Sequence, residues 1–286
     1  MKGILMAGGS GTRLNPITEG ISKQLIQIYD KPMVYYSLST LMLAKIQDIN
    51  IVCQSFHIDH YQKLLGDGSD FGINLTYSIQ NEPKGIADGI LISKDFIGKS
   101  ECALMLGDNF FWGQGFSTNL TNAKNNKGAS IFSVQVKNPS DYGIVEFDKA
   151  GRVISIEEKP KQPCSNYAVT GLYFYDNSVV DRAQDISPSD RGELEITDVN
   201  SSYLMENKLS TEILGRGFAW LDTGTIEGIY EASSFVRSIQ SQQGYQIANL
   251  EEIAFRNNWL TKNDLDNILS KKSESEYYNY LREIIE

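Results

Sequence analysis

A glycine-rich segment near the N-terminus offers the clearest chemistry in the sequence. A short apolar run, Gly3 to Ala7, leads directly into the sequence GGSGTR at residues 8–13. Glycine reaches backbone conformations closed to other residues and carries no Cβ, so successive N–H groups can turn toward one anion. Arg13 adds a permanent positive charge and a planar set of donors. The segment therefore predicts a loop that cradles a polyphosphate at the end of a buried strand.

Two better-known glycine loops do not match this segment. A Walker A loop requires a Gly-Lys-Ser/Thr sequence that is missing here, and a dinucleotide fingerprint requires a third glycine where Leu14 stands. A glycine cluster can also be a simple tight turn after an edge strand. The polar residues found elsewhere in the chain favour the phosphate loop over the turn.

Two aspartates each follow an apolar run and stand close to a glycine. Asp108 follows the sequence ALMLG, and Asp222 follows FAWL. Mg²⁺ binds one or two protein carboxylates together with phosphate oxygens and water. Acidic residues beside glycine are also common in turns. Taken with the glycine loop, the two aspartates favour a metal site at one edge of a sheet.

Further polar residues stand where they could contact the same ligand. Lys23 follows the glycine loop closely enough to fold back onto the same phosphates. Gln80 ends a strand-like run, and its amide could read the edge of a base while Gly85 lets the backbone approach that base.

The sequence EEKP at residues 157–160 closes another strand-like run. Pro160 is expected to keep Lys159 extended, because proline restricts the residue before it. Strict alternation would then send Glu158 and Lys159 to opposite faces. Both side chains could meet one ligand only if the strand twists or ends there.

The elements that must position these residues alternate between strand and helix. Strands are expected at Lys2–Ala7, Asp48–Gln54, Asn74–Gln80, Glu101–Gly107 and Ala129–Val136, and helices around residues 34–42, 59–65 and 87–97. This order predicts a doubly wound, mostly parallel α/β sheet that is covered on both faces. Ligands are then expected at the carboxyl ends of the strands.

After Tyr142 the pattern changes to shorter alternating segments, at Gly143–Phe147, Arg152–Ile156 and Tyr167–Tyr175. We interpret these as strands added to the core, in a lobe of about residues 140–220 that forms a lid or a sugar pocket. The core with this lobe is assigned to residues 1–240. Residues 241–286 are expected to form a C-terminal helical segment of three short helices, after a long helix at Thr225–Gln240.

Composition limits the class of protein. A chain of 286 residues with 41% hydrophobic content can bury one large core, or a core plus a small lobe. No apolar run approaches the roughly 18 residues of a membrane span, and the N-terminal run is too short for a secretory signal, so a cytoplasmic location is expected. A net charge of −10 disfavours a nucleic-acid surface. The three cysteines lack metal-ligand spacing and are expected to be reduced thiols in the core.

These segments together resemble the sugar nucleotidyltransferases. GGSGTRL and EEKP are typical of that family at large, whereas YAVTGLYFYD and RGELEITDVN are typical of its glucose-1-phosphate thymidylyltransferase branch. The likeness extends over about residues 2–260. It implies a Rossmann-like core with an inserted sugar-binding lobe and a homotetramer. It also implies Mg²⁺-dependent formation of dTDP-glucose and pyrophosphate from dTTP and glucose 1-phosphate, for dTDP-sugar pathways such as that of dTDP-rhamnose.

The resemblance also implies a role for each candidate residue, with Arg13, Lys23 and Lys159 as the catalytic cations. The nucleotide would be bound by Gly8, Gly11, Thr12, Arg13, Lys23, Gln24, Gln80 and Gly85; the sugar phosphate by Asn109, Tyr142, Gly143, Glu158, Lys159 and Val169; and Mg²⁺ by Asp108 and Asp222.

The chain departs from the family pattern at Gln27, Gln114, Ile226 and Asn249. None of these is an expected metal or phosphate ligand. Gln114 and Asn249 lie near segments that form a second nucleotide-sugar site in the family, so feedback inhibition is less strongly implied here than catalysis.

Two other functions fit the same residues. The chain could be a uridylyl- or adenylyltransferase for another sugar 1-phosphate, because the glycine loops are alike. Those with acetyltransferase or regulatory extensions usually carry hexapeptide repeats, which the chain lacks. It could also be a nucleotide-sugar sensor without turnover, although the presence of Arg13, Lys159, Asp108 and Asp222 argues against that.

Overall fold

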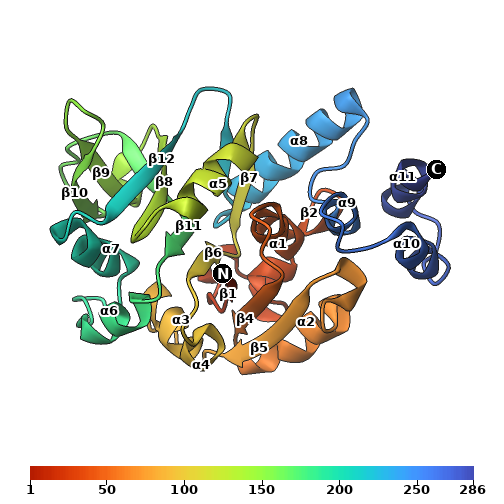
Figure 1. Cartoon of the computed structure of the whole chain (residues 1–286), viewed down its shortest axis with the longest axis horizontal. Coiled ribbons are helices and arrows are strands. Elements are labelled where there is room, and N and C mark those ends of the chain that lie inside the picture. The colour runs from red at the N-terminus through yellow and green to blue at the C-terminus, as the bar shows by residue number, and fades with distance from the viewer.

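A nine-stranded sheet runs through the computed structural model, which describes all residues from Met1 to Glu286 (Figure 1). Its strands are β1 (Lys2–Ala7), β4 (Asp48–Cys53), β5 (Asn74–Ile79), β6 (Cys102–Leu106), β8 (Ala129–Gln135), β9 (Gly143–Phe147), β10 (Val153–Glu158), β11 (Tyr167–Tyr175) and β12 (Leu209–Leu214). The order is β10-β9-β11-β6-β1-β4-β5, and β8 pairs with both β11 and β12.

The half of the sheet that contains the N-terminus is parallel, as the alternating pattern predicted. β5, β4, β1 and β6 are neighbours, and their register places Ala7 beside Cys53 and Cys53 beside Ile79. The carboxyl ends of these strands therefore lie at one level. The glycine loop, the segment after Gln80 and the segment after Gly107 all leave the sheet at this edge.

β11 is central to the sheet, which corrects our interpretation of it as an added strand. It lies antiparallel between β6 and β8, and β9 pairs with its first residues, Tyr167 and Ala168. Seven of its nine residues are buried, as expected of a strand with neighbours on both edges. The lobe therefore shares the main sheet with the core. Only β10 and β11 run against the direction of the other strands.

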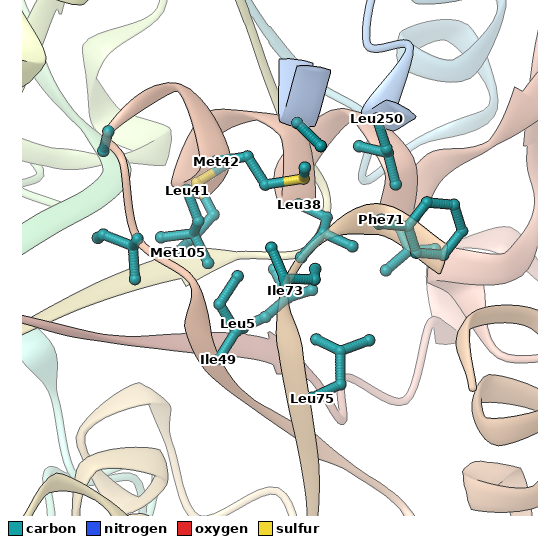
Figure 2. Close-up of a cluster of buried hydrophobic side chains, with 14 of the residues drawn as sticks. Leu5, Leu38, Leu41, Met42, Ile49, Phe71, Ile73, Leu75, Met105 and Leu250 are labelled. Carbon is teal, nitrogen blue, oxygen red and sulfur yellow. The ribbon is translucent and has the colours of Figure 1, made fainter. Parts of the chain in front are cut away.

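Helices cover both faces of the sheet, because successive strand residues point to opposite faces. Leu5 belongs to one hydrophobic cluster, while its neighbours Ile4 and Met6 belong to another. The first face is covered by α1 (Met33–Leu43), α2 (Ile58–Leu65) and α5 (Phe116–Asn125), and the second by α3 (Ile86–Ile92), α4 (Lys94–Ile97), α6 (Val179–Asp185) and α7 (Ile196–Met205). Figure 2 shows the first cluster, in which Leu38 and Leu41 of α1 lie over Leu5 and Ile49.

The chain ends in α8 (Ile226–Gln243), α9 (Leu250–Arg256), α10 (Lys262–Leu269) and α11 (Glu276–Ile285). The last three lie together at one side of the molecule (Figure 1). Leu250, Leu265 and Leu281 are completely buried in the same cluster as Leu5 and Leu38. The C-terminal helices are thus packed into the main core.

Two expectations from composition can be compared with the structure. Cys53 and Cys102 are buried, as expected, but Cys164 is exposed, so the prediction of a core thiol is wrong at that position. Cys164 follows β10 in a loop, where no element covers it. No helix of the structure combines the length and the apolar character needed to cross a membrane.

Leu281→Ala tests whether α11 belongs to the core. Because Leu281 is fully buried, its truncation is expected to lower the free energy of unfolding by about 2–5 kcal/mol. Met205→Ala, at a side chain that is 79% exposed, is the control and should change it by less than about 0.5 kcal/mol. Urea denaturation of both variants gives the comparison. A loss below about 1 kcal/mol for Leu281→Ala would show that α11 is only loosely attached.

Candidate active site

A cleft of about 740 Å³ lies between the parallel strands and the lobe. Asp108, which follows β6, is on its core side, and Glu158, at the end of β10, is on its lobe side. Nine of the residues singled out from the sequence line this cleft: Arg13, Asp108, Asn109, Tyr142, Gly143, Glu158, Lys159, Val169 and Asp222.

Asp108 and Asp222 converge because two short strands pair with each other. β7 (Asn109–Trp112) is antiparallel to β13 (Ala219–Asp222), and their register places Asp222 beside Asn109. The backbone N–H and the hydroxyl of Thr223 both donate to the carbonyl oxygen of Asp108, at 3.0 and 2.7 Å. Backbone hydrogen bonding therefore brings together two acids that are far apart in the sequence.

The two carboxylates differ in their ionisation. Burial and the neighbouring Asp108 carboxylate raise the pKa of Asp222, although Lys23 and Arg13 oppose this change. Burial would also raise the pKa of Asp108, but the Lys23 ammonium and hydrogen bonds from Lys23 and Asn109 lower it overall. A cation bound between the two carboxylates would reduce the repulsion between them.

Each carboxylate also has partners within the chain. Lys23 Nζ contacts Asp108 Oδ2 at 2.5 Å, and Asn109 Nδ2 donates to Asp108 Oδ1 at 3.0 Å. Asp222 Oδ1 accepts from the Gly224 N–H at 2.9 Å. A Cβ at Gly224 would lie 2.8 Å from both Arg13 Nη2 and Asp222 Oδ1, so the Arg13 guanidinium lies close to Asp222.

The donor set fits a hard divalent cation. The structure contains no group of three or more His, Cys, Asp or Glu residues that could hold a metal ion by themselves. Two carboxylates suit Mg²⁺, which binds few protein oxygens and completes its coordination shell with phosphate oxygens and water.

The glycine loop leaves three backbone N–H groups without a partner in the chain. Gly11 has a φ of 62°, in the left-handed region, and its carbonyl oxygen accepts from Thr18 Oγ1. The N–H groups of Gly9, Ser10 and Gly11 donate no hydrogen bond within the chain. They remain free for an anion, whereas Thr12 is exposed and Gly11 and Thr12 do not line the cleft itself.

The expected base-binding residues lie to one side of the cleft. Gln80 lines a separate, shallower pocket of about 350 Å³, and its Oε1 would lie 3.0 Å from a Cβ at Gly8. Gln80 Nε2 donates to Asp88 Oδ2 at 2.8 Å and to the Gly85 carbonyl at 3.2 Å. Its Oε1 accepts no hydrogen bond within the chain. Gly85 has a φ of 101° and no room for a Cβ against Leu194.

Gln24 lines neither of these two pockets. It is buried, and its Oε1 accepts from Ser22 Oγ at 3.1 Å and from Tyr61 OH at 3.4 Å. Its side chain packs against Gly107, where a Cβ would lie 2.8 Å from Gln24 Cγ. Gln24 therefore supports the backbone next to Asp108.

The prediction that Lys159 stays extended is wrong. Its φ is 44°, in the left-handed region, although a proline follows. β10 ends at Glu158, and the Lys159 N–H donates to the Tyr142 carbonyl at 3.0 Å. This long-range hydrogen bond and the pairing of Glu158 with Gly143 hold a conformation that costs on the order of 1–2 kcal/mol. As a result, Glu158 and Lys159 both line the cleft.

The Glu158 carboxylate is held by residues that received no role in the sequence analysis. Thr197 Oγ1 donates to Glu158 Oε2 at 2.6 Å, and Arg191 Nη2 lies 3.6 Å from Glu158 Oε1. Arg191 also pairs with Glu195 at 2.9 Å. Arg191, Glu195 and Thr197 all belong to the sequence RGELEITDVN. The resemblance to the family branch was therefore the signal that could have identified them.

Asn109 is likewise held by residues that sequence reasoning missed. Its Oδ1 accepts from Trp220 Nε1 at 2.7 Å and from the Gly171 N–H at 2.9 Å. A Cβ at Gly171 would lie 2.7 Å from the Asn109 amide, so this approach requires glycine. Asn109 therefore connects β11 and Trp220 to the Asp108 carboxylate.

A mainly parallel α/β core, with a glycine-rich loop, two carboxylates and a polar cleft at one sheet edge, fits a nucleotidyltransferase. The sequence model of the family described as "Nucleotidyl transferase" matches residues 2–239. The chain belongs to this family, in its group of glucose-1-phosphate thymidylyltransferases.

The relatives that carry this assignment match over their whole length. The glucose-1-phosphate thymidylyltransferase of Neisseria meningitidis is 52% identical over 286 residues, covering 100% of this chain and 99% of the relative. That of Mycolicibacterium smegmatis is 50% identical with the same coverage.

Solved structures share the fold. A Bacillus anthracis structure, described as a glucose-1-phosphate thymidylyltransferase in complex with sucrose, has a TM-score of 0.76 and 37% identity, covering 84% of this chain and 96% of that one. A UDP-glucose pyrophosphorylase in complex with UDP-glucose has a TM-score of 0.72 at 22% identity, covering 83% and 98%. The second likeness concerns the fold alone.

Asp222→Asn is expected to stabilise the protein at pH 7. The pKa of Asp222 is raised in the folded protein, so folding favours the protonated form and stability falls as pH rises through that pKa. An amide removes this unfavourable charge and can still accept from the Gly224 N–H. The gain in the free energy of unfolding should shrink as the pH falls toward the ordinary value of 3.8.

Chemical denaturation between pH 4 and pH 8 measures this dependence. Glu157→Gln is the matched control, because Glu157 is an exposed acid next to the cleft without an ion pair. A pH-independent loss of stability in Asp222→Asn would contradict the repulsion between the two carboxylates.

Proposed function

We propose that the protein transfers the thymidylyl group of dTTP to glucose 1-phosphate, forming dTDP-glucose and pyrophosphate. The observation that carries the proposal is that two carboxylates and two cations converge in the structure: Asp108, Asp222, Arg13 and Lys23. They lie across the cleft from Glu158 and Lys159, at the end of β10. The names of relatives that are about half identical over the full length support both substrates.

The reaction needs no protein nucleophile. A phosphate oxygen of glucose 1-phosphate attacks the α-phosphorus of dTTP in line, the bond from that phosphorus to the bridging oxygen breaks, and pyrophosphate leaves. The protein's task is to align two anions and to neutralise the charge that develops between them. In this proposal Arg13 and Lys23 bind the triphosphate, and Lys159 pairs with the attacking phosphate.

We also propose Mg²⁺ as the cofactor, with Asp108 and Asp222 as its protein ligands. When bound, it would neutralise phosphate charge and polarise the α-phosphate for attack. Burial and the neighbouring Asp108 carboxylate raise the pKa of Asp222, and a bound cation would favour its ionised form, which supports this assignment.

The base and the sugar are assigned to opposite ends of the site. Gln80 Oε1 is free to accept from a base N–H, and Gly85 lets the backbone approach the ring. On the lobe side, the Glu158 carboxylate is held by Thr197 and is suited to accept from sugar hydroxyls. Its neighbours in the cleft, Tyr142, Gly143 and Val169, complete the sugar pocket in this proposal. The product would feed dTDP-sugar synthesis, such as that of dTDP-rhamnose.

A pyrophosphate-release assay over a grid of nucleoside triphosphates and sugar 1-phosphates tests the proposal. The highest kcat/KM is expected for dTTP with glucose 1-phosphate. UTP offers the same hydrogen-bonding edge, and one methyl group is worth only about tenfold or somewhat more, so UTP should be a slower substrate. A preference for UTP or ATP would replace the thymidylyl assignment, and binding of nucleotide sugars without turnover would support a sensor.

Asp108→Asn and Asp222→Asn test the shared metal site. Each substitution removes a charged ligand of a hard cation, so each should lower kcat by on the order of a hundredfold or more. Because the two carboxylates would act as one site, the double variant should be little worse than the worse single variant. The measurement is kcat over a magnesium titration. Wild-type turnover in either single variant, or strictly multiplicative losses, would rule out the shared-metal assignment.

A further inference from the structure

Both oxygens of Asp108 are already engaged by groups of the chain itself. Oδ2 is paired with the Lys23 ammonium at 2.5 Å, and Oδ1 accepts from Asn109 Nδ2 at 3.0 Å. The side chains of Lys23 and Asp108 are only 7% and 22% exposed, so solvent screens the ion pair weakly. A cation that binds Asp108 must therefore compete with Lys23.

The four charged groups at the Asp108–Asp222 pair balance in formal charge without any ligand. Asp108 and Asp222 are negative, and Lys23 and Arg13 are positive. A divalent cation alone would add two positive charges and displace the Lys23 ammonium into a poorly hydrated position. A divalent cation that binds with a triphosphate adds no excess positive charge. The phosphate oxygens can accept hydrogen bonds from both Lys23 and Arg13.

The position of Lys23 allows this exchange. Its Cβ would lie 3.3 Å from a Cβ at Gly11, so its side chain starts beside the glycine loop. The N–H groups of Gly9, Ser10 and Gly11, which donate to nothing in the chain, mark the anion site there. The four rotatable bonds of lysine can carry the ammonium from Asp108 to an anion at the loop without moving the backbone.

We propose that Lys23 is an internal counterion of Asp108 that couples cation binding to triphosphate binding. The cation binds tightly only when the Lys23 ammonium pairs with a triphosphate instead of Asp108. By thermodynamic linkage, the bound cation strengthens triphosphate binding by the same factor. The inference rests on the proposed function, because it uses the same metal and phosphate sites. It adds that the protein without nucleotide binds the cation weakly, and that Lys23 is the cause.

Binding of Mn²⁺ to the protein without nucleotide tests the proposal, with free Mn²⁺ measured by electron paramagnetic resonance. Lys23→Met, which keeps the length of the side chain and removes its charge, should bind Mn²⁺ at least tenfold more tightly than the wild type. Lys63→Met makes the same change of net charge at an exposed lysine without an ion pair and should bind as the wild type does. In Lys23→Met/Asp108→Asn the gain should disappear.

Equal Mn²⁺ affinity in Lys23→Met and the wild type would overturn the proposal, as would a gain that persists without the Asp108 carboxylate. If Lys23→Met does not fold, Lys23→Gln replaces it with the same expected direction. Turnover of the wild type with dTTP and glucose 1-phosphate is measured separately. Failure of that assay would reject the proposed function, whereas the Mn²⁺ comparison concerns only the competition at Asp108.

Discussion

The short ladder between β7 and β13 is the interaction on which the site depends. It holds Asp222 next to Asn109, and Thr223 donates twice to the Asp108 carbonyl, so two carboxylates are kept close in spite of their repulsion. Burial, together with this repulsion, raises the pKa of Asp222. Backbone hydrogen bonds can hold such an arrangement because they do not depend on the ionisation of the side chains. Lys23 and Arg13 offset part of these effects on Asp222.

The antiparallel strand β11 decides how the two sides of the cleft are held relative to each other. It pairs with β6 on the core side and with β8 and β9 on the lobe side, so one sheet carries both the Asp108 loop and the lobe side of the cleft. The Gly171 N–H of β11 also fixes Asn109. A reaction that depends on alignment benefits from such a rigid connection, because small displacements of bound groups cost large factors in rate.

Polar residues outside the expected set give the expected ones their orientation. Trp220 holds Asn109, which in turn donates to Asp108, and Thr197 holds Glu158. These contacts satisfy buried or half-buried polar groups that would otherwise be costly and mobile. The same arrangement explains why Lys23 is available as a counterion, since Asn109 occupies only one of the two Asp108 oxygens.

The sequence did not predict β7, β12 and β13, or the helices α5, α6 and α7. By itself it determined eight strands of the main sheet and the helices α1, α2, α3 and α8–α11, and it indicated the residues whose chemistry suits phosphate, metal and sugar. These follow from local periodicity and from side-chain chemistry, which are properties of short segments. Only the tertiary structure decided that β11 is central, that Lys159 adopts a positive φ, that Cys164 is exposed and that Lys23 pairs with Asp108. Each of these depends on groups distant in the sequence. β11 needs the edges of β6 and β8, and Lys159 needs the Tyr142 carbonyl. Cys164 is exposed because no other element covers its loop, and Lys23 pairs with an aspartate at the end of another strand. Local patterns contain no information about which distant group satisfies a backbone N–H or a charge, so those choices appear only when the chain is folded.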